Sequence, residues 1–379
     1  MSASKVAVVR CLTYDDADVH AAVRSGIELL GGIDNFVAPD ERILLKPNVL
    51  AGDPPERCVT THPAILKAVG RIFQARTRHL YYGDSPGNGD PAPNLANSGL
   101  TAAAEQIGLQ PAEFTTGRQV EFPGPPQVKK LLIADGVLEA AGIVSLSKLK
   151  THMVTRMTGA VKNLYGCIPG QTKRRYHFTH PNAFDFSQLL VALNLLLKPK
   201  VRLHIMDGIR AMEGNGPRNG DPVQVGVLLF STDPVALDAV ACDLVELDPL
   251  RVSTTGPGAR WGLGTYRKEE IEVVGDSPAA SRPAGFRVKR GSVRDFSSQG
   301  LLARVDNLIA RRPVLDKRRC VRCGQCVQAC PVQPKALDWH DGNRKKPPGY
   351  VYSRCIRCFC CQEICPEGAI TVRSTFFRF

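Results

Sequence analysis

The feature of the sequence that most restricts its fold is a cysteine-rich phrase that occurs twice near the C-terminus. CVRCGQCVQACP begins at Cys320, CIRCFCCQEICP begins at Cys355, and both contain the spacing C-x₂-C-x₂-C-x₃-C followed by proline. Each matching cysteine is offset by 35 residues, which indicates an internal duplication. Nine of the thirteen cysteines lie within 320–365. Such clustering favours metal ligation over disulfide formation.

The spacing predicts [4Fe–4S] clusters, because a cuboidal cluster needs four thiolates around one compact object. Tight turns can supply three of them from a single short loop. The two phrases resemble those of bacterial two-cluster ferredoxins, in which the fourth cysteine of each run ligates the other cluster. This resemblance implies one cluster on Cys320, Cys323, Cys326 and Cys365, and a second on Cys355, Cys358, Cys361 and Cys330.

A pair of structural zinc sites is the alternative interpretation, because zinc also accepts four thiolates. Zinc sites usually consist of two C-x₂-C pairs with a longer spacer, and they do not need a proline after the fourth cysteine. Cys360 is additional to both motifs, and we expect a free thiol near a cluster. The four scattered cysteines are expected to be small buried hydrophobes: Cys11, Cys58, Cys167 and Cys242.

Upstream of these motifs, apolar runs of strand length alternate with segments of helical periodicity. Strands are expected at 5–9, 42–49, 79–84, 142–149, 201–208, 225–231 and 271–276. Helices are expected at 15–33, 62–75, 185–198 and 233–247. This alternation predicts a large α/β domain with a mostly parallel sheet.

Composition divides the chain into three parts. Residues 1–276 form the predicted α/β domain. Residues 277–298 lose the alternation and gain Pro, Ser and Gly, which indicates a boundary, and a short amphipathic segment follows at 299–313. Residues 277–312 are therefore expected to be a linker with a short helix. Residues 313–379 form a predicted small α+β, ferredoxin-like domain with two [4Fe–4S] clusters.

The start of the chain has no apolar signal core, and no stretch approaches the roughly eighteen uninterrupted apolar residues of a membrane span. We therefore expect a cytoplasmic protein without a membrane segment. The net charge is +13, but the absence of nucleic-acid motifs argues against a nucleic-acid partner. From residue 313 onward there are twelve Lys and Arg against five Asp and Glu. This excess of positive charge has two interpretations. It is merely a solvated basic face, or it attracts an acidic electron donor or acceptor similar to a ferredoxin or flavodoxin.

A stretch without acidic residues runs from Ala140 to Phe184 and contains several Lys, Arg and His residues. Within it, Lys148, Lys150 and His152 follow a predicted strand. Open parallel sheets bind ligands at the carboxyl ends of their strands. This pattern favours an anionic small molecule, a carboxylate or a phosphate, over a solvated basic surface.

Other polar residues lie at the ends of predicted strands: Lys46, Asn48, Asp84, Asp207 and Asp233. In a parallel sheet these residues converge on one edge, so we expect them to form one site. Asp233 precedes a proline and has a second explanation as a helix N-cap.

The glycine-rich loop 212–222 lacks the context and spacing of a dinucleotide fingerprint, and the sequence contains no Walker A motif. We expect this loop to be a mobile cover. A second cofactor such as flavin is neither supported nor excluded.

ILLKPN, SLSKLKTH, TGAVKNLYG, MDGI and DPVALDAVACDL, followed by the cysteine motifs, resemble the family called domain of unknown function 362, whose members are iron–sulfur centre proteins. The resemblance covers nearly the whole chain. It implies a large α/β domain joined to two [4Fe–4S] clusters, without a defined reaction. Its recurring positions add weight to Lys46, Asn48, Lys148, Lys150, His152, Lys162 and Asn163.

These observations favour an iron–sulfur oxidoreductase, or its reductase component, that passes electrons through two clusters to an anionic substrate or second cofactor in the α/β domain. Lys148, Lys150 and Lys162 are expected to hold the anion, and His152 is the candidate proton donor. Two alternatives stay open. One is a non-catalytic electron carrier that docks a partner enzyme, and the other is a factor for cofactor or cluster maturation.

Overall fold

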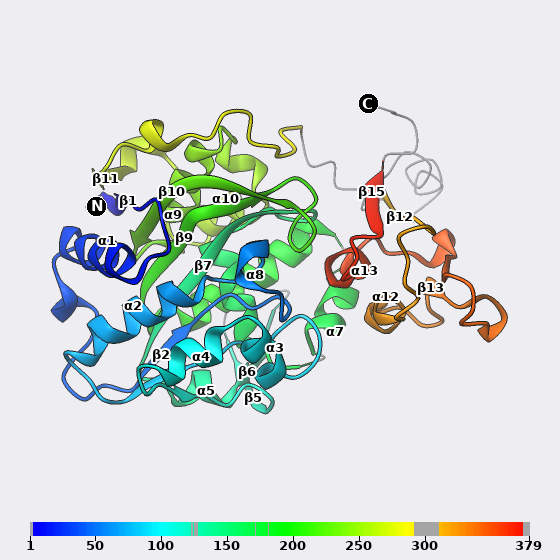
Figure 1. Cartoon of the computed structure of the whole chain (residues 1–379), viewed down its shortest axis with the longest axis horizontal. Helices are drawn as coiled ribbons and strands as arrows, with labels where there is room; N and C mark the ends of the chain where they lie inside the picture. Colours follow the sequence, from blue (N-terminus) through cyan, green and yellow to red (C-terminus); the bar gives the residue numbers. More distant parts are fainter. Residues whose placement is uncertain are drawn as a thin grey trace.

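The computed structural model describes residues 3–122, 124, 128–170, 172–180, 182–291 and 311–373. A large N-terminal domain has a small C-terminal domain at its side (Figure 1). Most of the predicted linker and of the amphipathic segment lies outside the described residues. Before this gap the chain still packs on the large domain, because Phe286 is buried in one of its cores and Arg287 pairs with Glu213 at 2.6 Å. The boundary at residue 276 stays a prediction.

The large domain is built on a nine-stranded mixed sheet. The strands follow the order β11 (Ile271–Gly275), β1 (Ser4–Arg10), β10 (Asp221–Ser231), β9 (Val201–Glu213), β7 (Gly142–His152), β2 (Ile43–Lys46), β3 (Leu80–Tyr82) and β4 (Gln110–Pro111), with β8 (Arg156–Thr158) paired to β7. Strand β10 is antiparallel to both of its neighbours and β8 to β7, whereas the other pairs are parallel. The prediction of a mostly parallel α/β domain is confirmed.

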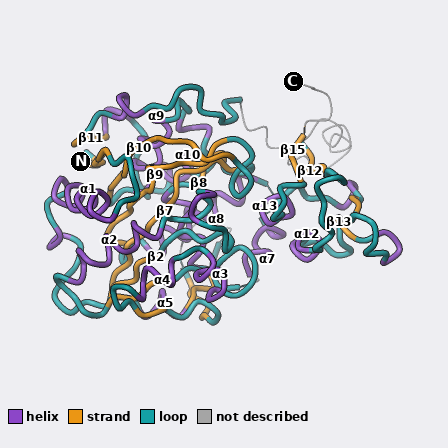
Figure 2. Tube along the Cα trace, in the orientation of Figure 1, coloured by secondary structure: helices purple, strands orange, loops and turns teal. Residues whose placement is uncertain are grey.

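Helices cover both faces of this sheet. Successive side chains of a strand point to opposite faces, so apolar residues on both faces need helices to pack against. In β1, Ala7 and Val9 join a core with α1 (Asp16–Leu29) and α2 (Pro63–Gln74), and Val6 and Val8 join a core with α9 (Pro234–Leu244). Helix α8 (Ala183–Leu197) packs in a third core with Leu44 and Ile143 of the sheet. The strands therefore form the middle of three layers (Figure 2).

The remaining elements of the large domain are short. They are α3 (Pro91–Asn97), α4 (Leu100–Glu105), β5 (Gly117–Glu121), β6 (Lys130–Ala134), α5 (Asp135–Glu139), α6 (Ala160–Asn163), α7 (Thr172–Thr179) and α10 (Thr255–Arg260). No helix in the described ranges is both long and apolar enough to cross a membrane.

Asp233 lies away from the other strand-end residues. Strand β10 runs antiparallel to β9, so its last residues lie at the opposite edge of the sheet. Asp233 instead begins α9, where its carboxylate accepts hydrogen bonds from the N–H groups of Val235 and Ala236 at 2.8 and 2.9 Å. The prediction that Asp233 joins the strand-end site is therefore wrong, and the alternative of a helix N-cap is confirmed.

The small domain contains the same unit twice. Helices α12 (Gln325–Ala329) and α13 (Cys360–Ile364) each follow one cysteine loop, at the same offset as the cysteines. Two short antiparallel pairs complete the domain: β12 (Arg312–Leu315) with β15 (Ile370–Arg373), and β13 (Leu337–Asp338) with β14 (Gly349–Tyr350). This is the predicted small α+β, ferredoxin-like domain.

Candidate functional site

Eight of the nine cysteines of the small domain line two separate cavities. The outer cavity is lined by Cys320, Cys323, Cys326 and Cys365, and the inner cavity by Cys330, Cys355, Cys358 and Cys361. Each cavity combines three cysteines of one loop with the last cysteine of the other. This is the grouping that the resemblance to two-cluster ferredoxins implies.

Left-handed turns bring the three cysteines of each loop to the same cavity. Arg322 and Gly324 have φ angles of 60° and 79°, and the equivalent Arg357 and Phe359 have 58° and 59°. These turns reverse the direction of the chain between successive cysteines. The short helix that follows each loop, α12 or α13, then carries the fourth cysteine to the other cavity.

The donor sets of both cavities fit [4Fe–4S] clusters. Four thiols face each cavity, and much of the remaining lining of the inner cavity is apolar, including Val332 and Leu337. Tyr350 Oη lies 3.3 Å from Cys361 Sγ and can donate a hydrogen bond to it, which is the kind of contact that tunes a cluster-bound thiolate. Cys360 lines neither of the two cavities.

Helix α13 attaches the small domain to the large one (Figure 1). Gln362 is fully buried, and its Nε2 donates to the backbone carbonyl and the Oδ1 of Asn215, both at 3.1 Å. Arg218 Nη1 donates to the Ile364 carbonyl at 2.7 Å. The glycine-rich loop 212–222 therefore binds α13 in this structure, and its role as a mobile cover stays a prediction.

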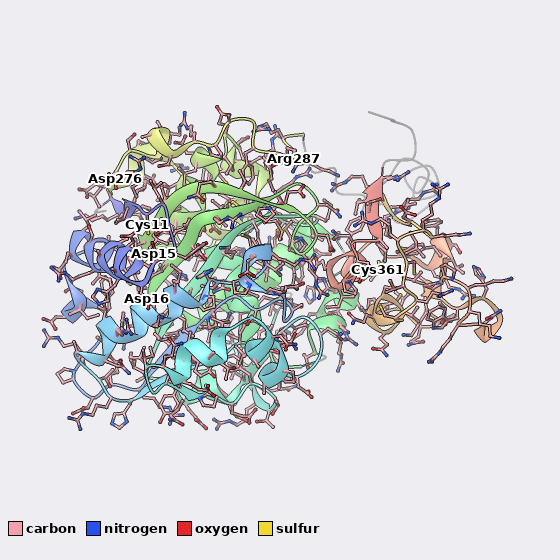
Figure 3. All side chains as sticks on the ribbon, viewed as in Figure 1. Cys11, Asp15, Asp16, Asp276, Arg287 and Cys361 are labelled. Atoms are coloured by element: carbon pink, nitrogen blue, oxygen red, sulfur yellow. The ribbon has the colours of Figure 1, made fainter. Side chains whose placement is uncertain are left out.

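A third cavity, the interdomain cavity, lies where α13 meets the large domain and measures about 80 Å³. Figure 3 labels Cys361 on this side of the small domain. Four residues that the sequence predicts lie in its wall: Asn48, Asp84, Lys162 and Asn163. The wall also contains Ser85, Thr158, Tyr165, Lys173, Arg174, His177, Cys360 and Glu363. Both domains thus contribute polar side chains to one cavity.

Lys162 lines the interdomain cavity and has neither an ion pair nor a hydrogen bond to its ammonium among the described residues. In the described part of the chain, no carboxylate or hydrogen-bond acceptor binds its ammonium, which lies 5.9 Å from the centre of the Tyr165 ring. Burial lowers the pKa of Lys162, while Glu363 opposes that shift. Thr158 is only 2 % exposed, and its hydroxyl also has no partner among the described residues. Together they can receive an anion, because a buried hydroxyl normally has a hydrogen-bond partner and an ammonium attracts negative charge.

Helix α6, which carries Lys162, begins at a buried carboxylate. Asp238 of α9 accepts hydrogen bonds from the N–H groups of Ala160 and Val161 at 2.6 and 3.3 Å. Burial raises the pKa of Asp238 to about 7, although these two N–H groups act in the opposite direction. Asp238 therefore fixes the short helix that positions Lys162.

Lys46 lies outside the cavity lining and forms a buried ion pair with Asp84 of the cavity wall. Lys46 Nζ lies 2.8 Å from Asp84 Oδ1, and Asp84 Oδ2 accepts a hydrogen bond from the Val49 N–H at 2.7 Å. Asn163 Nδ2 donates to Ser145 Oγ at 2.9 Å. Because Asp84 neutralises Lys46, this lysine supports the wall and offers no free charge to a ligand.

We expect Gly166→Ala to destabilise the protein by about 2–4 kcal/mol, because overpacking would disturb this buried pair. A Cβ on Gly166 would overlap Asp84 Oδ1 and lie 2.7 Å from Lys46 Nζ. Denaturant unfolding of the full chain measures the loss. The matched control is Gly256→Ala, because the nearest atom to that added Cβ is Leu250 Cδ2 at 3.9 Å. Equal losses in both variants would contradict this explanation.

His152 lies behind Glu363 and does not line the cavity. Its Nε2 is 3.0 Å from Glu363 Oε1, and its Nδ1 accepts hydrogen bonds from the N–H groups of Val154 and Thr155 at 3.1 and 3.3 Å. Burial lowers the pKa of His152 to about 4, so the neutral ring carries its proton on Nε2. Burial raises the pKa of Glu363, but His152 and Lys162 outweigh this effect and bring it to about 2. His152 therefore orients an ionised carboxylate.

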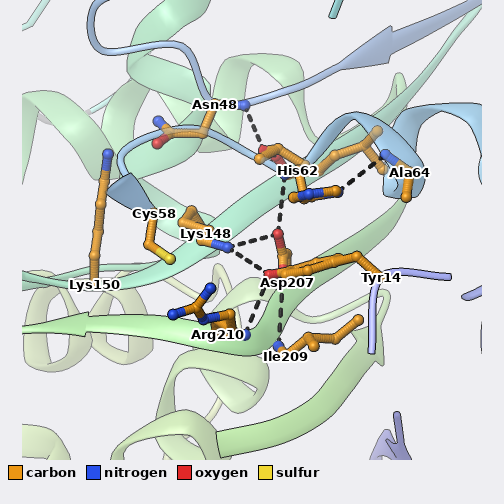
Figure 4. Close-up of polar contacts among 12 residues, drawn as sticks. Tyr14, Asn48, Cys58, His62, Ala64, Lys148, Lys150, Asp207, Ile209 and Arg210 are labelled. Atoms are coloured by element: carbon orange, nitrogen blue, oxygen red, sulfur yellow. Dashed lines mark hydrogen bonds and ion pairs between the residues drawn. The ribbon is translucent and has the colours of Figure 1, made fainter. Parts of the chain in front are cut away.

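Lys148 and Asp207 form a separate buried network (Figure 4). Lys148 Nζ lies 2.7 Å from Asp207 Oδ2, and neither side chain is more than 1 % exposed. Tyr14 Oη donates to Asp207 Oδ1 at 2.8 Å, and the His62 N–H donates to Asp207 Oδ2 at 3.0 Å. The charges of Lys148 and Asp207 are thus paired with each other inside the protein.

Lys150 is buried as well, and its ammonium donates to the Val59 carbonyl. Burial lowers the pKa of Lys150 to about 7, and the nearby charge of Lys162 lowers it further. The remaining predicted anion-binding residues are absent from the lining of the interdomain cavity: Lys46, Lys148, Lys150 and Asp207.

Several residues of the interdomain cavity were not predicted as site residues. Lys173, Arg174 and His177 lie in the acid-free stretch, and that stretch was their signal. Arg174 Nη1 also reaches the Gln328 carbonyl of the small domain at 3.3 Å. Glu363 carried no signal, because it lies between cluster cysteines and faces a domain that is distant in the sequence.

Comparisons with known proteins identify both parts of the chain. The family described as "Domain of unknown function (DUF362)" matches residues 43–243, and a "4Fe-4S dicluster domain" matches residues 312–366. The second match favours iron–sulfur ligation over zinc. A thylakoid-associated protein of Synechocystis sp. is 36% identical over 305 residues, which cover 77% of this chain and 94% of the relative.

Two solved structures are similar to part of the chain. The lactate racemase apoprotein from Thermoanaerobacterium thermosaccharolyticum has a TM-score of 0.41 and 12% identity, over 64% of this chain and 56% of that one. A protein from Thermotoga maritima has a TM-score of 0.36 and 8% identity, over 65% and 59%. The match spans less than two thirds of either structure. On the family match and the Synechocystis relative, the chain belongs to the DUF362 family, with a 4Fe–4S dicluster domain at its C-terminal end.

Proposed function

We propose that this chain is an iron–sulfur oxidoreductase that passes electrons through two [4Fe–4S] clusters to a small anion in the interdomain cavity. One observation carries the proposal. Cys360, which lies between two cysteines of the inner cavity in sequence, shares the interdomain cavity with the unpaired Lys162. When bound, the clusters would supply one-electron carriers. A cytoplasmic location stays a prediction.

Lys162 and Thr158 are the residues that would hold the anion. The ammonium supplies charge and the hydroxyl supplies a hydrogen bond, and neither makes a hydrogen bond or an ion pair with another described residue. A cavity of about 80 Å³ has room for about five to eight water-sized groups, since one water needs roughly 10–15 Å³. This size favours a short carboxylate or a phosphate over a flavin.

The small domain completes the site. Cys360 and Glu363 of α13 form part of the cavity wall. They reach this position because Gln362 binds α13 to the loop 212–222 of the large domain. Because the small domain covers one side of the cavity, less water would surround a bound anion, and its attraction to Lys162 would be stronger than in open solvent. His152 serves as a positioning residue through Glu363.

We expect the anaerobically purified protein to release a small anion on denaturation, measured by mass spectrometry with iron and sulfide in the same sample. Lys162→Met should retain normal iron and weaken binding of inorganic phosphate or a short carboxylate by about 10- to 150-fold, the effect of one charged hydrogen bond. Calorimetric titration measures the affinity.

Lys129→Met is the matched control, because Lys129 is exposed on the large domain. It should bind the probe anion as wild type does. Two results together would contradict the substrate site: the wild-type protein releases no small anion, and Lys162→Met does not change the affinity for phosphate or for the short carboxylate. The result would then support the alternative of a non-catalytic electron carrier.

A further inference from the structure

The two cysteine loops have the same pattern but differ in exposure. In the first loop, Val321 is 57 % exposed, and Arg322 and Cys323 are exposed as well. The three equivalent residues of the second loop, 356–358, are all partly covered. The second loop leads directly into α13, which is buried against the large domain. The outer cavity therefore faces solvent, and the inner cavity lies on the side of the interdomain cavity.

Basic side chains surround the exposed loop. They are Lys317, Arg318, Arg319, Arg322, Lys345 and Lys346, and all are exposed. Arg322 Nη1 donates to the Lys345 carbonyl at 3.0 Å, which holds two of these segments together. Among the described residues, none of the six cations has a carboxylate within 4 Å. Asp316 precedes these basic residues and Glu367 lines the outer cavity, so among these residues the six cations outnumber the carboxylates.

We infer that this outer loop is a docking surface for an acidic one-electron carrier protein. An exposed apolar residue, Val321, stands beside a thiol of the outer cavity and is surrounded by charge. This is the usual anatomy of a protein interface, an apolar centre within a polar rim. The positive rim would steer an acidic partner, and the exposed loop would bring it close to the outer cluster. The inference rests on the clusters of the proposed function, but not on the anion site.

The test uses the full chain with its clusters and a flavodoxin, which is an acidic one-electron carrier. Lys317→Glu with Arg318→Glu should lower the association rate at least about tenfold at low salt, and the difference should shrink at high salt. The matched control is Arg78→Glu with Lys129→Glu, which makes the same change in net charge on exposed sites of the large domain. It should stay within about twofold of wild type.

Val321→Glu is a second variant that leaves the basic residues in place. It should raise the Kd for oxidised flavodoxin at least about tenfold, as expected for an apolar interface centre. Val351→Glu is its control, because Val351 is 40 % exposed elsewhere in the small domain. All variants should contain wild-type amounts of iron and sulfide and be reduced by dithionite to the same end point, which shows that the clusters are intact.

Two outcomes would overturn the docking surface. In one, the control charge reversal slows association as much as the reversal beside the loop. In the other, Val321→Glu binds flavodoxin as tightly as Val351→Glu does. If the variant Lys317→Glu with Arg318→Glu loses iron, the comparison of Val321→Glu with Val351→Glu alone decides whether the loop is a docking surface. Failure of the anion site leaves both results unchanged, because they report encounter with the carrier and not turnover.

Discussion

Cys365→Ser is expected to remove the cluster of the first loop, and Cys330→Ser the cluster of the second. The fourth cysteine of each loop lines the cavity of the other loop, so its replacement removes one ligand from the other loop's cluster. Iron and sulfide should each fall by about half, from the roughly eight of two such clusters. The electron paramagnetic resonance spectrum of reduced Cys365→Ser should match that of Cys323→Ser, and Cys330→Ser should match Cys358→Ser.

Cys360→Ser supplies the control for this series. Cys360 adjoins a ligand in sequence but lines neither cluster cavity, so this variant should keep wild-type iron and sulfide. A Cys365→Ser spectrum that matched Cys358→Ser would mean that each loop keeps its own fourth cysteine. Loss of iron in Cys360→Ser would make that residue a ligand in place of its neighbour.

The fold could be predicted where apolar periodicity extends over several turns or a long strand. The strands at 5–9 and 142–149 and the helices at 62–75 and 233–247 all appear in the structure close to those positions. Strand β8 has three residues and α6 has four, which is too short for a period to be recognised. These two short elements carry Thr158 and Lys162, so the most informative part of the site was the hardest to place.

The direction of β10 could have been predicted from better strand limits. Strand β9 continues to Glu213 and β10 begins at Asp221, whereas the apolar pattern ends at 208 and resumes at 225. A connection as short as 214–220 permits only antiparallel strands, because a parallel crossover needs a dozen or more residues. The longer apparent gap hid this hairpin, and the error in placing Asp233 followed from it.

The site was predicted only in part because neither the exact ends of the strands nor their register can be located from sequence. Lys148 and Asp207 were expected at strand ends, but β7 continues to His152 and β9 to Glu213, so both residues lie within their strands. The parallel pairing of β7 with β9 sets them directly opposite each other, so two predicted ligand residues neutralise one another. Part of the wall of the interdomain cavity comes from α13, some 200 residues further along the chain, and only tertiary structure reveals that contact.

Lys148→Met is expected to destabilise the protein by about 3–5 kcal/mol, because it leaves the buried carboxylate of Asp207 without its cation. Asp207 is fully buried, and the hydroxyl of Tyr14 and the N–H of His62 are neutral donors that cannot replace the lost charge. Denaturant unfolding measures the loss, and Lys129→Met, on an exposed site, should unfold like wild type.

The double variant Lys148→Met with Asp207→Asn separates a structural pair from an anion site. Asparagine keeps an acceptor for Tyr14 and His62 and removes the uncompensated charge, so the double variant should recover about half or more of the stability lost in Lys148→Met. It should also bind the probe anion as wild type does, because neither residue lines the interdomain cavity. A stable Lys148→Met protein that fails to bind the anion would assign Lys148 to the ligand and move the site from Lys162 to the network around Asp207.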